Sequence, residues 1–219
     1  MLTSLRIRNF KAWEDTGAIR LAPLTVIFGA NSAGKSSLGH LLLALQQTAQ
    51  SSDRKRALHL GDKTTSIDLG TFADCLHGHD LGETLEFELG WKLAKPLDVR
   101  DPLRPSERYA GEYLALAVKL AASKTGQPEV KDMRYELSHQ GSPVLDIALR
   151  RGDNRKFILR SERYQFKMSD GRKWPLEEPE KFYRVSDLTM ARFKNAGFLS
   201  DFALATESML GSIAYLGQC

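Results

Sequence analysis

A run of glycines, a lysine and a serine near the N-terminus is the part of the sequence best suited to chemistry. The run is Gly29-Ala-Asn-Ser-Ala-Gly34-Lys35-Ser36. Glycine permits backbone dihedrals that a side chain would forbid, so consecutive N–H groups can turn inward and surround an anion. A lysine at such a nest favours phosphate, and a serine hydroxyl can supply one oxygen ligand to Mg²⁺. We expect phosphate contacts from Gly29, Asn31, Ser32, Ala33, Gly34, Lys35, Ser36 and Ser37, with Ser36 also a metal ligand and Ser37 capping the first helical turn.

The segments on either side of this run are the elements that must position it. Residues 24–28 form a compact apolar run, which predicts a buried strand ending at Gly29. After Ser36, leucines recur at spacings of three and four, which predicts an amphipathic helix as far as residues 50–53. Strand, glycine loop and helix in this order are the context in which the motif binds a nucleoside triphosphate, so ATP and Mg²⁺ are the expected cofactors.

The rest of the chain alternates between strand patterns and turn residues. Period-two apolar patterns predict strands over residues 5–10, 19–21, 85–91, 113–122, 133–139, 144–150, 156–160 and 163–167. From residue 113 these strands form an antiparallel meander. Three prolines and several charges predict a loop over residues 96–108. Helical spacing over residues 198–210 and a last strand over residues 212–216 complete the pattern.

Composition sets broad limits on the class of protein. Of 219 residues, 42% are hydrophobic and 26% charged, which is ordinary for a globular protein that buries one core. No apolar run reaches the roughly 18 residues of a membrane span, and no secretory signal opens the chain, so we expect a cytoplasmic protein without a membrane partner. Two distant cysteines suggest neither a disulfide framework nor a zinc site. The net charge of +4 is compatible with a polyanionic partner.

Two stretches of sequence resemble a known family. Residues 5–11 (Leu-Arg-Ile-Arg-Asn-Phe-Lys) and residues 24–37 resemble the opening of ABC-type ATPase heads related to the SMC, recombination-repair and OLD proteins. Residues 17–25, 41–47, 60–62 and 68–72 resemble a bacterial subgroup of AAA-family ATPases, some linked to phage defence. The resemblance covers residues 1–91, weakens in the middle block and returns at residues 215–217.

This resemblance implies a fold, a partner and one further site residue. The implied fold class is α/β, a P-loop NTPase of the ABC type with a mixed sheet, an antiparallel β subdomain and no C-terminal lobe. Residues 1–219 would form a single N-terminal lobe, with a nucleotide-binding core at 1–91, a β insertion at 110–168 and the start of a helical part at 190–219. The basic residue after Asn-Phe approaches the phosphates in such heads, which assigns that role to Lys11, although a solvated surface lysine is the alternative. Family members form dimers through the nucleotide interface.

The resemblance also leaves parts of an ATPase unplaced. Neither a Q-loop glutamine, nor a signature motif, nor a Walker B Asp-Glu pair can be identified, so no catalytic residue is assigned. We expect a chain that ends before Walker B, binds ATP and hydrolyses it poorly. The alternative is a non-hydrolysing, nucleotide-gated regulatory module for an effector such as a nuclease. A small-molecule kinase is disfavoured by the antiparallel middle block.

Four further features carry weaker hypotheses. Leu137-Ser-His-Gln-Gly141 resembles a signature motif, and Val144-Leu-Asp146-Ile resembles a Walker B strand. A signature motif begins a helix that crosses over before the Walker B strand, and a crossover of about ten residues cannot fit between these two segments. We therefore expect a hairpin turn and a plain strand. His77-Gly-His79-Asp80 has metal-ligand residue types but is expected to be a polar surface loop. The alternative is a position near the nucleotide, where related heads place the Q-loop. DNA contact is assigned to the basic residues 150–151, 155–156 and 160–163, with a solvated strand edge as the alternative.

Overall fold

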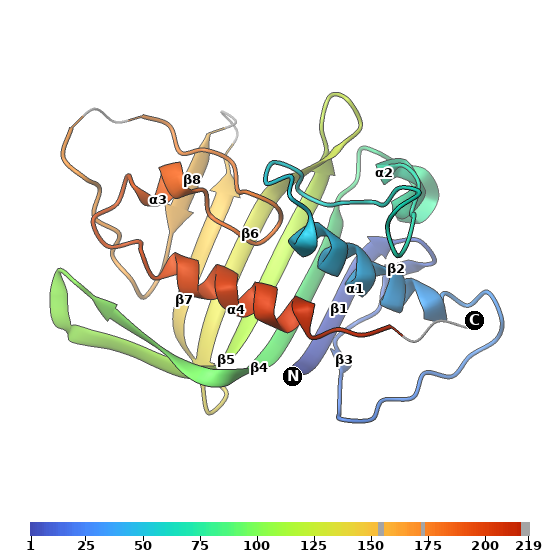
Figure 1. The fold of residues 1–219 in the computed structure, drawn as a ribbon, viewed down its shortest axis with the longest axis horizontal. Helices are drawn as coiled ribbons and strands as arrows, with labels where there is room; N and C mark the ends of the chain where they lie inside the picture. Colours follow the sequence, from blue (N-terminus) through green and yellow to red (C-terminus); the bar gives the residue numbers. More distant parts are fainter. Residues whose placement is uncertain (153–155, 172–173, 216–219) are drawn as a thin grey trace.

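The computed structural model describes residues 1–152, 156–171 and 174–215. Its largest element is a sheet of eight strands in the order β2-β1-β4-β5-β6-β7-β8, with β3 also beside β1 (Figure 1). The strands are β1 (Leu2–Phe10), β2 (Trp13–Asp15), β3 (Ile19–Arg20), β4 (Leu85–Asp101), β5 (Arg104–Ala122), β6 (Pro128–His139), β7 (Ser142–Arg151) and β8 (Phe157–Arg160). One sheet therefore joins strands from residues 1–91 with strands from residues 110–168.

The fold class is α/β with an open sheet in which every pairing between the named strands is antiparallel. The expected mixed sheet is thus not found in the part of the chain that the structure describes. Because neighbouring strands follow each other along the chain, short turns suffice to connect most of them. The predicted meander is confirmed for β5 to β8.

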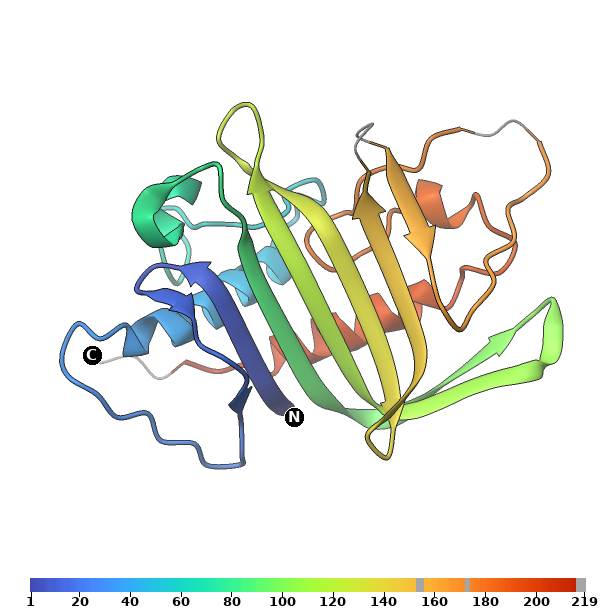
Figure 2. The ribbon, with the colours of Figure 1, turned by 180° about the vertical axis from the view of Figure 1, so that it is seen from behind.

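Helices cover one face of the sheet (Figures 1 and 2). They are α1 (Lys35–Gln50) and α4 (Leu199–Gly211), with the shorter α2 (Phe72–Cys75), the 3₁₀ helix η1 (His77–His79) and α3 (Asp187–Met190) around them. Alternate residues of the strands, such as Phe87 and Leu89 of β4, are buried beneath this layer together with Leu41 of α1. The amide Nε2 of Gln46 in α1 donates to the carbonyl of Leu210 at 3.0 Å, which joins the two long helices.

The other face of the sheet carries no helix in the part of the chain that the structure describes (Figure 2). Ion pairs cross between its strands: Arg6 with Asp15, Lys119 with Glu86, and Arg150 with Asp132. Exposed pairs of this kind contribute little stability each, about 0 to 1 kcal/mol. In each of these three pairs one positive charge is compensated by one negative charge.

The loop predicted over residues 96–108 is wrong, because the ends of β4 and β5 form a two-stranded arm there (Figure 1). The three prolines occupy positions that need no ladder hydrogen bond. Pro96 lies at a shift of register between Lys92 and Leu97, and Pro102 lies in the turn. Pro105 lies on a part of β5 that has no β6 neighbour, since that pairing begins at Tyr113.

The buried strand predicted over residues 24–28 is also wrong. The segment has no strand assignment, and its side chains are exposed, from 46% at Ile27 to 88% at Phe28. The segment lies away from the sheet, in the connection between β3 and α1 (Figures 1 and 2). Its apolar run is of the kind that is buried on both faces within a parallel sheet, and the described residues offer it no parallel neighbour.

Two shorter strand predictions fail as well. Residues 163–167 form no strand, and Tyr164 packs instead against the rings of Tyr109 and Phe198. Residues 212–215 have no regular structure, and Leu216 lies outside the described residues. Both segments have the alternating apolar pattern of a strand, but tertiary contacts replace strand pairing: Tyr164 packs against aromatic rings, and the Ile213 carbonyl accepts a hydrogen bond from Gln46 of α1.

Candidate phosphate-binding site

The helix α1 begins directly after the glycine loop. Gly34, at its N-terminus, adopts φ +81°, a left-handed conformation that favours glycine. A Cβ atom added to Gly34 would lie 2.7 Å from the Cβ of Ala12 and 3.0 Å from Nε1 of Trp13. Glycine is therefore required at position 34 twice over, by its backbone conformation and by the close approach of the β1–β2 turn. Gly29 has φ +159°, close to extended backbone, so it carries no such requirement.

The first turn of α1 offers free backbone donors. No side chain caps the helix, so the cap expected from Ser37 is wrong; this residue is instead buried, with its N–H donating to the Gly34 carbonyl at 3.0 Å. In the described chain, the N–H groups of Lys35 and Ser36 donate to no backbone carbonyl outside the helix. The N-terminus of a helix also carries a partial positive charge. Such a terminus can accept an anion.

Lys35 closes over its own loop. Its Nζ donates to the carbonyl of Gly29 at 2.8 Å and to that of Ala30 at 2.6 Å. The cation therefore lies at the start of the loop, while the hydroxyl of Ser36 is on an exposed residue one position along the helix. Exposed loop residues complete the expected site: Gly29, Asn31, Ser32 and Ala33.

Lys11 lies in the β1–β2 turn, which packs against this loop. The Lys11 N–H donates to the carbonyl of Cys75 at 2.8 Å, and Nδ1 of His77 donates to the carbonyl of Lys11 at 2.8 Å. Burial, followed by the positive charge of Lys11, lowers the pKa of His40 on α1. Lys11 therefore lies within electrostatic reach of the same helix that carries Lys35.

Strained backbone gathers around this region. Asn9, Lys11, Ser32 and His79 are non-glycine residues with positive φ, at 55°, 49°, 64° and 59°. Each such residue costs about 1 to 3 kcal/mol and persists only where surrounding contacts hold it, and such residues cluster at ligand sites. At Asn9 the side-chain amide supplies one of those contacts by donating to the Thr84 carbonyl at 3.1 Å.

The His77-Gly-His79-Asp80 segment is a supporting loop. Its histidines direct Nδ1 to backbone carbonyls, His77 to Lys11 and His79 to Ala73. Among the residues that the structure describes, no group of three histidine, cysteine, aspartate or glutamate side chains could hold a metal ion. The contact with Lys11 places this loop beside the candidate site.

The two other motif-like segments have structural roles, as predicted. Gln140 and Gly141 form the tight turn between β6 and β7, with φ +50° and +80°. Asp146 is buried in β7, where its carboxylate accepts hydrogen bonds from the Glu162 N–H and, at 3.5 Å, from the Ser161 hydroxyl. Asp146 thereby ties the segment after β8 to β7.

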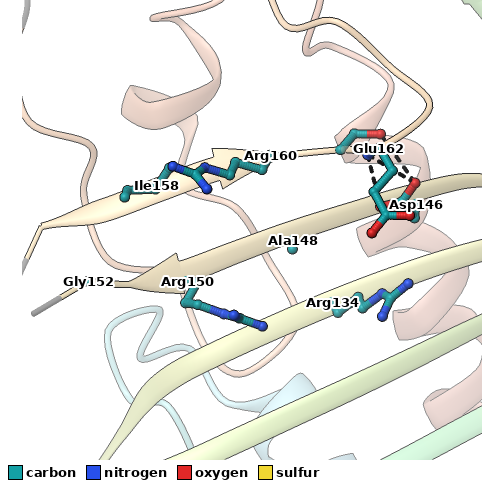
Figure 3. A pocket seen from close by; sticks show the side chains of 9 residues that line it. Arg134, Asp146, Ala148, Arg150, Gly152, Ile158, Arg160 and Glu162 are labelled. Atoms are coloured by element: carbon teal, nitrogen blue, oxygen red, sulfur yellow. Dashed lines mark hydrogen bonds between the residues drawn. The ribbon is translucent and has the colours of Figure 1, made fainter.

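A concave surface lies on the open face of the sheet, over β6, β7 and β8 and away from the glycine loop (Figure 3). Its volume is about 370 Å³, and its lining includes Arg134, Arg150 and Arg160 together with Asp146 and Glu162. Carboxylates accompany at least three of the five described basic residues to which DNA contact was assigned. The ion pairs are Arg150 with Asp132, Arg151 with Glu129, and Arg163 with Asp146; Arg155 lies outside the described residues.

Sequence patterns did not identify Trp13 as part of the candidate site. Its indole Nε1 donates to the carbonyl of Gly34 at 3.0 Å. Only the three-dimensional fold brings the β1–β2 turn to the glycine loop, so no spacing rule could have found this contact. No spacing rule could have found His77 either, whose ring donates a hydrogen bond to the backbone carbonyl of Lys11.

Neither a protein-family model nor a curated protein matches this chain. Within the described ranges, no helix is both long enough and apolar enough to cross a membrane. The case for a function therefore rests on the motif and on the geometry around it.

Proposed function

We propose that this chain binds Mg-ATP through the loop from Gly29 to Ser36, as a P-loop head of the ABC type. The observation that carries the proposal is the first turn of α1, where backbone N–H groups without carbonyl partners adjoin a lysine and a serine hydroxyl. Phosphate oxygens suit this arrangement because they accept several hydrogen bonds and carry the negative charge that a helix N-terminus favours.

Binding a triphosphate requires Lys35 to exchange its partners. Its Nζ now donates to two neutral carbonyls. The ammonium group is charged in both arrangements, but a phosphate oxygen carries a negative charge that a carbonyl lacks, so the new bonds add an attraction between opposite charges. The exchange therefore favours the bound state, and Lys11 adds a second positive charge from the β1–β2 turn.

Mg²⁺ fits this site as a companion of the phosphates. The ion retains several waters and commonly takes one or two protein ligands plus phosphate oxygens, so the exposed Ser36 hydroxyl is a sufficient protein ligand. When bound, the ion would bridge and neutralise phosphate oxygens. We propose binding without efficient hydrolysis, because neither a Walker B Asp-Glu pair nor a signature motif can be identified in the sequence.

Calorimetric titration with Mg-ATP tests the proposal. The wild-type chain should bind, and Lys35→Ala should bind about tenfold or more weakly, which is the loss expected from a hydrogen bond to a charged acceptor. Lys124→Ala is the matched control, because Lys124 is exposed in the turn between β5 and β6. Equal affinity of Lys35→Ala and wild type would refute the assignment of the loop.

A second proposal concerns nucleotide-dependent association. The exposed apolar segment of residues 24–28 runs directly into the loop, so a surface suited to burial adjoins the proposed nucleotide. We propose that Mg-ATP promotes a homodimer through this region, which would serve either an ATPase head or a nucleotide-gated regulatory module. Size-exclusion chromatography with light scattering should show a larger species with Mg-ATP than without it, and an unchanged mass would contradict the proposal.

A further inference from the structure

The carbonyl of Gly34 is held by two donors from different parts of the chain. Nε1 of Trp13 and the backbone N–H of Ser37 both donate to it, each at 3.0 Å. The Ser37 bond belongs to the first turn of the helix. The Trp13 bond comes from a separate element, the strand β2, whose Trp13 pairs with Phe10 of β1.

Holding this carbonyl fixes a backbone donor of the loop. A peptide unit is planar and trans, so the C=O of Gly34 and the N–H of Lys35 share one plane and point in opposite directions. Any rotation that moved the Lys35 N–H would also break the bond from Trp13. This N–H is among the donors available to an anion at the start of α1.

Trp13 is itself firmly placed. On one side the turn is tied to Cys75 and His77 through the backbone of Lys11, and on the other Ala12 lies so close to Gly34 that no side chain fits between them. The indole is partly buried, which leaves its ring little freedom. The turn therefore forms a rigid wall against the glycine loop.

We propose that Trp13 is a positioning residue of the nucleotide site, which sets the direction of the Lys35 N–H by holding the carbonyl of Gly34. This inference rests on the proposed binding of Mg-ATP. It assigns Trp13 to the triphosphate part of the ligand and gives the indole no role in stacking on the base.

Two ligands separate positioning from base stacking. Trp13→Phe retains an aromatic ring but removes the donor, so it should weaken binding of Mg-ATP and of Mg-tripolyphosphate by the same factor, about fivefold for one neutral hydrogen bond. Because the phenyl ring of Trp13→Phe could still stack on the base, unchanged affinity for both ligands, or a loss of affinity confined to Mg-ATP, would overturn the proposal. Trp174→Phe is the matched control, since Trp174 is exposed and far along the chain from the loop.

A spectroscopic measurement on the unaltered chain avoids any effect of the substitution on folding. The chain has three tryptophans, so its ¹⁵N spectrum should contain few indole N–H resonances, and the one that disappears in Trp13→Phe belongs to Trp13. Addition of Mg-tripolyphosphate should shift this resonance in the wild type but not in Lys35→Ala. A Trp13 resonance that stays in place while the ligand binds would overturn the positioning role.

The outcomes also distinguish this inference from the function on which it rests. If Lys35→Ala binds Mg-ATP as tightly as the wild type, the proposed function fails and the role of Trp13 fails with it. If Lys35→Ala loses affinity while Trp13→Phe keeps the wild-type affinity for both ligands, only the role of Trp13 is refuted. Equal weakening of both ligands by Trp13→Phe, with Trp174→Phe unchanged, supports both.

Discussion

Lys35 and Gly34 show how single residues could make a loop ready for an anion. The lysine side chain already spans the loop, and the glycine allows the chain to turn sharply into α1. The ammonium group of Lys35 donates to backbone carbonyls in the free loop, and a rotation of the side chain alone would bring it to a phosphate. Within the loop, the lysine and the glycine prepare the site, and the β1–β2 turn supports it from outside through Trp13.

Two glycines of one helix provide a matched test of this local geometry. Gly34→Ala should destabilise the chain by about 2 kcal/mol or more, because a side chain is strained at φ +81° and collides with Ala12. Gly39→Ala should stabilise it by about 0.5 to 1 kcal/mol, since Gly39 is helical with open space around it. Urea unfolding of both variants checks the prediction, and two shifts of the same sign would contradict it.

The pKa of His40 tests where Lys11 lies. Burial and Lys11 depress this pKa below the ordinary value of 6.5, so the unfolded state binds more protons in the window between the two values. Stability should therefore fall as the pH drops from about 6.5 through the folded pKa. Lys11→Met should raise the pKa of His40 in an NMR titration, and Lys124→Met should leave it unchanged. A His40 pKa insensitive to Lys11→Met would place the ammonium group elsewhere.

Lys181 stabilises the far end of α1. It is buried, and its Nζ donates to the carbonyls of Ala49 and Ser51 at 2.7 and 2.8 Å, where the helix ends with unpaired carbonyls and a partial negative charge. Lys181→Met should lower the free energy of unfolding by about 2 kcal/mol, because buried carbonyls lose a charged donor. Thermal unfolding measures the change, with the exposed Lys131→Met as the control; equal melting temperatures for the two variants would refute this capping role.

At the scale of elements, residues 24–28 show the limit of pattern-based prediction. The run Leu-Thr-Val-Ile-Phe has the composition of a buried strand, yet a strand also requires a neighbour to pair with its backbone. In the described chain, the backbone of these residues makes no hydrogen bond to another backbone group. The local sequence favours a strand, but a strand forms only where the edge of a sheet is available to pair with its backbone.

Hydrogen exchange should distinguish this segment from its neighbours. The amides of Val26, Ile27 and Phe28 should exchange rapidly, whereas those of Leu41 and Leu45 in α1 should be protected by helical hydrogen bonds and burial. Mass spectrometry of deuterated peptides measures the difference. Protection of residues 26–28 comparable to that of α1 would show that they do have a strand partner in solution.

Much of the fold was nevertheless predictable from local patterns. The helix after the glycine loop, the helix near residue 200 and the strands β5 to β8 follow directly from periodicities of 3.6 and 2. The arm formed by β4 and β5 was not predictable from local patterns. Its prolines lie at a register shift, a turn and an edge, which only the paired strands reveal. At the candidate site the motif identified Lys35 and Ser36 but not Trp13, whose contact joins distant segments.

At the scale of the whole molecule, the two faces of the sheet differ in character. One face is buried beneath α1 and α4, and their packing holds the glycine loop at the edge of the helical layer (Figure 1). The other is open (Figure 2) and bears ion pairs between neighbouring strands, such as Lys119 with Glu86 and Arg150 with Asp132. The arrangement gives the loop a rigid support while leaving its exposed side accessible to a ligand.

The central claim is that this loop binds the phosphates of ATP, and mapping the bound ligand by NMR tests it most directly. Addition of Mg-ATP to the ¹⁵N-labelled chain should shift the backbone N–H resonances of Gly34, Lys35 and Ser36 most strongly, with smaller shifts at Lys11 and Trp13. Shifts confined to the concave surface lined by Arg134, Arg150 and Arg160, or no shifts at saturating Mg-ATP, would contradict the claim.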